Sequence, residues 1–300
     1  MNSYDPHRWT SHLFDIEGSM VREILVRVSV SVIWAAVVVA LVLYEPEYFR
    51  SFAIPSTAHA LVGTALGLLL VFRTNSSYDR FWEGRKQWGG IVNECRNLAR
   101  QTSVWLANDP KLAQDIIDWT IAFPFATMQR LRKGSGIGTP FHHLSSEEVT
   151  QVNASQNSPL AIARIITARI LAAHQGDLID GRQMMMLDQN VQLLVDYLGA
   201  CDRIRATPLP FAYTVHLRRV LIVYCLSLPL ALIRDYGWGT VPTTMLISYS
   251  LFGIEEIGVE IEDPFGLTAN DLPLESICDG IQSQLAEIRD TLSPVTNTVS

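Results

Sequence analysis

The sequence predicts an all-α protein, an integral membrane helical bundle with four transmembrane helices and a cytoplasmic helical region. Of the 300 residues, 48% are hydrophobic and only 18% are charged, which is less charge than a soluble domain usually carries. Two pairs of long uncharged segments are separated by stretches with apolar residues at helical spacing. We therefore expect a single domain over residues 1–290 and a flexible tail over residues 291–300.

The first pair of apolar segments covers residues 24–44 and 52–72. Val28–Leu43 contains sixteen uncharged residues, and the long side chains of Arg22 and Arg27 at its near end can reach the lipid headgroups. The second segment contains twenty-one uncharged residues in a row. Because a helix needs about 20 apolar residues to cross a hydrocarbon core of about 30 Å, both segments are predicted to be transmembrane helices.

The charges that flank this pair predict its orientation. The connection Tyr44–Arg50 carries two glutamates and one arginine. The outer flanks are basic instead, with Arg8, Arg22 and Arg27 before the first segment and Arg73, Arg80, Arg85 and Lys86 after the second. By the positive-inside rule, we expect a multi-pass protein of the cell membrane with both termini in the cytoplasm.

A second pair of apolar segments lies late in the chain, at residues 220–233 and 236–254. Each contains one proline, which a membrane helix tolerates when neighbouring helices satisfy its backbone. Between the two pairs, residues 75–130 and 160–206 mix charged and apolar residues at helical spacing and contain few strand signals. We predict cytoplasmic helices in both of these regions.

The composition and motifs argue against two classes of function. After Phe72, basic residues alternate with aromatic ones such as Trp82 and Trp88, a mixture that suits either nucleic acid or a membrane interface. The formal net charge of −7 favours the interface, since nucleic-acid-binding domains are usually basic. No GxSxG elbow places a nucleophile beside a base. We therefore predict no nucleic-acid partner and no enzymatic activity.

The second apolar segment has two faces of interest. Gly63 and Gly67 form a GxxxG pair, which allows neighbouring helix backbones to approach closely. Thr64, Leu68 and Phe72 form an adjacent stripe at i, i+4 and i+8. If several copies of the helix surround an axis, this stripe can form a narrow apolar constriction that controls flow by dewetting. The alternative is that the stripe packs within one subunit.

An acidic run over residues 253–266 follows the last apolar segment. It contains Glu255, Glu256, Glu260, Glu262 and Asp263. These carboxylates can supply the oxygen ligands of a metal ion, or they can pair with arginines such as Arg203, Arg205 and Arg218. The sequence leaves both interpretations open.

Three blocks of the sequence resemble the bestrophin family in its bacterial branch. They are LGLLLVFRTNSSYDRFWEGRKQWG, ACDRIRATPLPFAY and EIEDPFGLTANDLPLE, spread from Leu66 to Glu275. The resemblance implies a homopentameric ion channel of a bacterial inner membrane, with four transmembrane helices per subunit and one pore on the fivefold axis. It further implies that Thr64, Leu68 and Phe72 line the pore neck. Thr64 departs from the family pattern of three apolar side chains, which should make the neck easier to wet.

The resemblance also predicts a cytoplasmic aperture and bears on metal binding. Alignment from the block at residues 200–213 places the aperture position at Arg182, where five guanidinium groups would favour anions. The alternative is that Arg182 forms a salt bridge. The dense acidic run of calcium-gated members is lacking, so we predict no cofactor and no calcium gating. Glu262, Asp263 and Asp271 remain as a residual metal or salt-bridge site.

Together, these features predict a channel that conducts small inorganic ions passively, with chloride or another small anion as the first choice. Its partners are four further copies of the chain and membrane lipids. The overall acidity favours the alternative of a cation-selective channel with the same fold. The other alternative is a non-conducting membrane scaffold.

Overall fold

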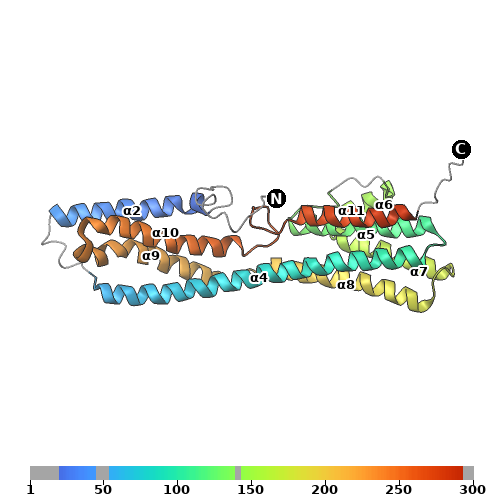
Figure 1. Ribbon diagram of the computed structural model, residues 1–300, viewed down its shortest axis with the longest axis horizontal. Coiled ribbons are helices and arrows are strands. Elements are labelled where there is room, and N and C mark those ends of the chain that lie inside the picture. The colour runs from blue at the N-terminus through green and yellow to red at the C-terminus, as the bar shows by residue number, and fades with distance from the viewer. Residues whose placement is uncertain (1–19, 45–53, 139–142, 293–300) are drawn as a thin grey trace. The chain divides into compact units, whose positions relative to one another are not determined.

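A computed structural model describes residues 20–44, 54–138 and 143–292, which contain helices and no strands (Figure 1). The prediction of an all-α fold is confirmed. The described residues form two compact units, and the single domain expected over residues 1–290 stays a prediction. Unit 1 contains the chain up to Phe81 together with Pro208–Asp263 and Leu267–Asp271. Unit 2 contains Trp82–Thr207, Pro264–Gly266 and the chain from Leu272.

Unit 1 contains the long apolar helices. These are α2 (Val21–Tyr44), the first part of α4 (Ser56–Trp105), α9 (Phe211–Tyr236), the short 3-10 helix η2 (Gly237–Gly239) and α10 (Thr240–Glu260). Helix α10 packs along both α2 and α9, and α2 also packs against α9. Among the described residues, three segments are long and apolar enough to cross a membrane, namely Val21–Tyr44, Ser56–Trp105 and Phe211–Glu260.

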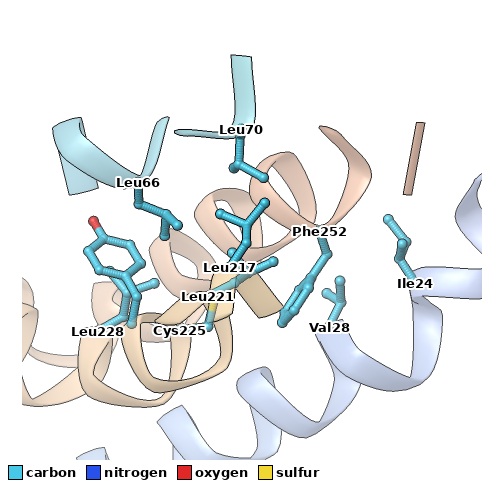
Figure 2. Close-up of a cluster of buried hydrophobic side chains, with 10 residues drawn as sticks. Ile24, Val28, Leu66, Leu70, Leu217, Leu221, Cys225, Leu228 and Phe252 are labelled. Carbon is cyan, nitrogen blue, oxygen red and sulfur yellow. The ribbon is translucent and has the colours of Figure 1, made fainter. Parts of the chain in front are cut away.

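An apolar core joins the four long helices of unit 1 (Figure 2). Helix α4 contributes one face of its apolar part, on which Leu66 and Leu70 are each only 1% exposed. Two polar contacts reinforce its packing against α9: the Tyr213 hydroxyl donates to the Leu69 carbonyl at 2.9 Å, and His59 Nε2 lies 2.9 Å from Ser227 Oγ. The core consists of Ile24, Val28, Leu66, Leu70, Leu217, Leu221, Tyr224, Cys225, Leu228 and Phe252.

The helix boundaries differ from the expected ones in an informative way. The segment predicted at residues 52–72 does not end there, because α4 continues without interruption through the 50 residues Ser56–Trp105. The expected segment 220–233 is extended to Phe211–Tyr236, and the expected segment 236–254 is displaced to Thr240–Glu260. Gly237, at φ +50°, ends α9 in a backbone conformation that favours glycine. The connection predicted to face outward, residues 45–50, lies outside the described residues.

The two glycines of the GxxxG pair have different surroundings. A Cβ atom at Gly63 would collide with the hydroxyl of Tyr224, so Gly63 is needed for the close approach of α9 within one subunit. A Cβ atom at Gly67 would meet no atom of the described chain within 4 Å. Only the first glycine therefore serves packing inside the subunit.

Unit 2 is built around α5 (Pro110–Leu131), which packs against α7 (Ser158–Gln175) and α11 (Leu274–Thr291). Trp119 and Phe123 on α5 are fully buried. The unit is completed by the second part of α4, by α6 (Ser146–Ala154) and by α8 (Gly181–Ala206). The central position of α5 explains why apolar residues cover almost its whole circumference.

Capping residues divide the two predicted cytoplasmic regions into separate helices. Asp109 accepts a hydrogen bond from the Leu112 amide at 3.1 Å, and Pro110 is the first residue of the helix that follows. These two residues begin α5 inside the region 75–130. Asp180 and Gln183 form a capping box that begins α8 inside the region 160–206. Helices α6 and α11 were not predicted, and α11 ends at Thr291, inside the expected tail, of which residues 293–300 lie outside the described chain.

All four cysteines are buried and free, and we predict that they are unreactive in the folded protein. Burial raises the pKa of Cys201 and of Cys278 to about 12, and it also raises the pKa of Cys95, so the reactive thiolate is scarce near neutral pH. Treatment with a maleimide at pH 7.5 should modify fewer than about one thiol per chain before denaturation and about four after it. Mass spectrometry of the intact protein measures this, and rapid labelling of the folded protein would contradict the buried placement.

Candidate functional site

The stripe predicted to line a pore lies on the face of α4 that is not used for packing in unit 1. Thr64 is exposed, and Leu68 and Phe72 are each 56% exposed. Each stripe residue is two positions from a residue of the buried face, and two positions correspond to about 200° around a helix. The stripe is therefore on the opposite side of α4 from Leu66 and Leu70. It stays open to a further chain or to an aqueous path.

The hydroxyl of Thr64 is positioned by its own helix. Thr64 Oγ1 donates a hydrogen bond to the Ala60 carbonyl at 3.0 Å. Its donor capacity is used, whereas its oxygen lone pairs remain available to water. Within the stripe, Thr64 is thus a wettable position that is followed by two apolar ones.

A buried carboxylate lies directly beyond the stripe. Arg73 follows Phe72 in sequence but points to the packed side, where its side chain is 1% exposed. Its Nη1 donates to Glu255 Oε1 at 2.5 Å, and Glu255 is itself only 2% exposed. The Nε atom of Arg218 donates to the same oxygen at 2.9 Å. Two guanidinium groups therefore share one buried oxygen, and the opposite charges of Arg73 and Glu255 compensate each other's removal from water.

Further ion pairs extend this arrangement across the four long helices of unit 1. Arg27 Nη1 donates to Glu256 Oε2 at 2.6 Å and to Glu255 Oε2 at 3.3 Å. Glu262 Oε2 lies 3.9 Å from Arg73 Nη2. We call this set the Glu255 cluster; it contains three arginines and three glutamates, Arg27, Arg73, Arg218, Glu255, Glu256 and Glu262.

The cluster shows that part of the acidic run pairs with arginines. Of the three arginines considered as partners from sequence, Arg218 pairs with Glu255. Arg205 instead donates to the Arg130 carbonyl at 2.6 Å. Arg27 and Arg73 were not recognised as partners. The available signal was that each interrupts or ends an apolar segment, where a charge needs a counter-charge.

The three residues considered as a residual metal site have separate local roles. Glu262 Oε1 accepts from the Leu209 amide at 3.0 Å. Asp271 Oδ2 accepts from the Thr268 amide at 2.6 Å. Asp263 precedes Pro264, at the end of unit 1. Within the described part of the chain, no group of three or more His, Cys, Asp or Glu residues has the arrangement of a metal site.

Arg182, predicted at the cytoplasmic aperture, lies in the first turn of α8 in unit 2. Its side chain is exposed, and no ion pair of Arg182 is formed with the described residues. The amides of this first turn carry a partial positive charge, which adds to that of the guanidinium group. The salt bridge considered as the alternative role is therefore not present within the described chain.

The long apolar helices and their buried charges define the chain as a helical integral membrane protein. The chain belongs to the bestrophin family, since residues 1–287 match the family described as Bacterial/Fungal Bestrophin protein. A crystal structure of a bacterial bestrophin homolog from Klebsiella pneumoniae superposes with a TM-score of 0.84 at 28% identity, covering 89% of this chain and 98% of that one. The resemblance inferred from sequence is confirmed.

Two relatives carry names that describe a function. A voltage-dependent anion channel-forming protein of Nostoc sp. (strain PCC 7120) is 37% identical over 95% of this chain and 93% of its own length. A voltage-dependent anion channel-forming protein of Escherichia coli (strain K12) is 31% identical over 94% of this chain and 92% of its own length. The family and these relatives identify an ion channel of the membrane rather than an enzyme.

Proposed function

We propose that the protein is one subunit of a homopentameric channel through which small anions, chloride first, pass along a single axial pore. The observation that carries this proposal is the exposure of Leu68 and Phe72 on the unpacked face of α4. Exposed apolar side chains in a row need either lipid, protein or a dewetting constriction beside them. Five copies of α4 around an axis would use this row as the neck of the pore.

The placement of the chain in its membrane follows from the same proposal. Each subunit would cross the bilayer four times, with α2, the first part of α4, α9 and α10. The basic residues at one end of α2 and after Phe72 favour the cytoplasm on that side, so both termini would be cytoplasmic. For a bacterial bestrophin, the membrane would be the inner one.

A planar bilayer experiment tests the proposal directly. Purified protein is inserted into a bilayer that separates two concentrations of potassium chloride, and the reversal potential is measured. We expect discrete currents, and we expect their reversal potential to lie close to the equilibrium potential of chloride. A reversal potential close to the equilibrium potential of potassium would instead support the cation-selective channel, which the net charge of −7 favours. The absence of current from protein shown to be inserted would support the scaffold.

The threonine in the neck leads to a prediction of its own. In Thr64→Val, a methyl group replaces the hydroxyl group, so the neck becomes apolar at all three positions and loses its wettable ring. We expect the current at a fixed voltage to fall by roughly fivefold, because more of the channels have a dewetted neck. Single-channel recording measures the open probability. Thr64→Ser, which keeps the hydroxyl, is the control, and an equal loss in both variants would contradict the argument.

The aperture leads to a second prediction. We propose that Arg182 lines the cytoplasmic exit of the pore, where its charge and the first turn of α8 favour anions. Arg182→Ala should lower the ratio of chloride to potassium permeability by roughly threefold, measured as a shift of the reversal potential. Arg164→Ala, at another exposed arginine of unit 2, is the control. An unchanged reversal potential in Arg182→Ala would place the residue away from the pore.

The acidic run would be structural rather than a calcium switch. Glu262 holds the Leu209 amide and lies next to Arg73, so its carboxylate is already engaged. The carboxylate of Asp271 is engaged as well, since it accepts the Thr268 amide. Titration with calcium during the bilayer recording tests this assignment, and the expected result is a current that does not depend on calcium.

A further inference from the structure

Unit 1 has a groove that combines apolar walls with two arginines at one end. The groove has a volume of about 430 Å³ and lies between α2 and α9. Arg27 and Arg218 both bond Glu255, so they lie at the same level. Beyond them the groove is lined by Val30, Ile222 and Leu226, and the Glu255 side chain lines it between the two arginines.

The two helices run in the same direction along the groove. Seven residues beyond Arg27, the Trp34 indole N–H donates to the Leu226 carbonyl at 2.8 Å, and Leu226 is eight residues beyond Arg218. This bond ties α2 to α9 at the far end of the groove. The groove therefore extends about 11 Å from the arginines toward Trp34, at 1.5 Å per residue.

Two of the three arginines of the Glu255 cluster, Arg27 and Arg218, line this groove. The side chains of Arg27 and Arg218 are 42% and 49% exposed, whereas those of Glu255 and Glu256 behind them are 2% and 10% exposed. Each guanidinium group has five N–H donors, but within the described chain Arg27 donates only through Nη1 and Arg218 only through Nε. The remaining donors are available to an anion.

We propose that the groove binds one anionic phospholipid of the cytoplasmic leaflet. Its phosphate accepts hydrogen bonds from Arg27 and Arg218, and one acyl chain lies along Val30, Ile222 and Leu226. The arginines end the apolar segments of their helices, so they lie at the depth of lipid phosphates. Guanidinium groups bind phosphate oxygens in a bidentate manner, and the apolar walls exclude water from the acyl chain. Free phosphate makes no use of these walls.

Binding of phosphatidylglycerol, measured by native mass spectrometry of the full-length protein in detergent, tests the polar end of the site. We expect phosphatidylglycerol to bind about tenfold more tightly than phosphatidylcholine with the same acyl chains. Arg218→Gln should abolish this preference. The matched control is Arg219→Gln, because Arg219 is exposed at nearly the same depth but does not line the groove. An equal preference for phosphatidylglycerol in both variants would overturn the proposal.

A second pair of variants leaves the ion pairs intact, in case Arg218→Gln does not fold. Ile222→Trp fills the groove, whereas Val223→Trp adds similar bulk on a neighbouring face of α9, about 100° away, that does not line the groove. We expect Ile222→Trp to weaken phosphatidylglycerol binding about tenfold and Val223→Trp to change it less than twofold. Similar affinities in the two variants would show that the lipid binds elsewhere.

Two further outcomes would also overturn the proposal. Displacement of phosphatidylglycerol by an equal concentration of inorganic phosphate would reveal a simple anion site. Cross-linking of a photoreactive residue at Val30 to another subunit would show that a second copy of the chain covers the groove. Because lipid binding is measured without ion currents, the result is separate from the test of the proposed channel.

Discussion

Replacement of Glu255 by glutamine is expected to destabilise unit 1 by about 3–5 kcal/mol, the usual result of removing one partner from a buried ion pair. Arg73 keeps its charge at 1% exposure, and its nearest remaining carboxylate is Glu262, with the closest atoms 3.9 Å apart. Arg218 loses the same negatively charged partner. A glutamine also presents N–H donors to guanidinium donors, which have no lone pairs to accept them. The melting temperature of the purified protein, followed by fluorescence-detected gel filtration, measures the loss.

The neighbouring glutamate provides the control for this prediction. Glu256 bonds Arg27, whose side chain is 42% exposed and stays hydrated when the partner is removed. Glu256→Gln should therefore lower the free energy of unfolding by only about 1 kcal/mol. The double variant Arg73→Gln with Glu255→Gln removes both buried charges. The free energy of unfolding that it loses should be about 1–3 kcal/mol less than the sum of the losses in the two single variants. Equal melting temperatures for Glu255→Gln and Glu256→Gln would contradict the central role of Glu255.

Phe72→Ala is expected to give the largest functional change, an increase of roughly tenfold in the current at a fixed voltage. Phe72 is the bulkiest residue of the stripe, and its truncation in every subunit would widen the neck at that ring. A wider ring holds water more easily, so the dewetted state becomes less favourable. A tenfold change corresponds to only about 1.4 kcal/mol, which is a small part of the solvation energy of an ion. Recording from a single channel in a planar bilayer measures the effect.

Val62→Ala is the matched control for the neck. Val62 is also on α4 and is 50% exposed, but it is ten residues from Phe72, which corresponds to about 280° around the helix and places it off the stripe. Its truncation should leave the current within about twofold of the original value. Equal increases in current for both variants would mean that any truncation on α4 raises the current, so that the effect is not specific to the neck. No change for either variant would remove Phe72 from the pore and with it the proposed neck.

The position of the stripe could be predicted from the sequence only in part. The i, i+4, i+8 spacing places Thr64, Leu68 and Phe72 on one face of a helix, but it does not show which face packs inside the subunit. The structure identifies Leu66 and Leu70 as the buried face, because α9 lies against them. That choice depends on contacts between residues more than a hundred positions apart, which periodicity does not encode.

The helix boundaries show a similar division. The apolar run up to Phe72 predicted a helix end at the membrane boundary, because hydropathy changes there. The residues directly after Arg73 are Thr74, Asn75 and Ser76, which have low helix propensity, yet α4 continues to Trp105. The change in hydropathy therefore did not mark the end of the helix, and the membrane boundary near Phe72 stays a prediction.

The sequence by itself determined the all-α class, the apolar segments, the family and the spacing of the stripe, because each depends on composition or on local order along the chain. Only the tertiary structure decided the partners of the charges. Glu255 meets Arg73 across 182 positions and Arg27 across 228. Any of several arginines could have balanced the acidic run, and the packing of α2, α4, α9 and α10 selects the three that are brought to one buried carboxylate.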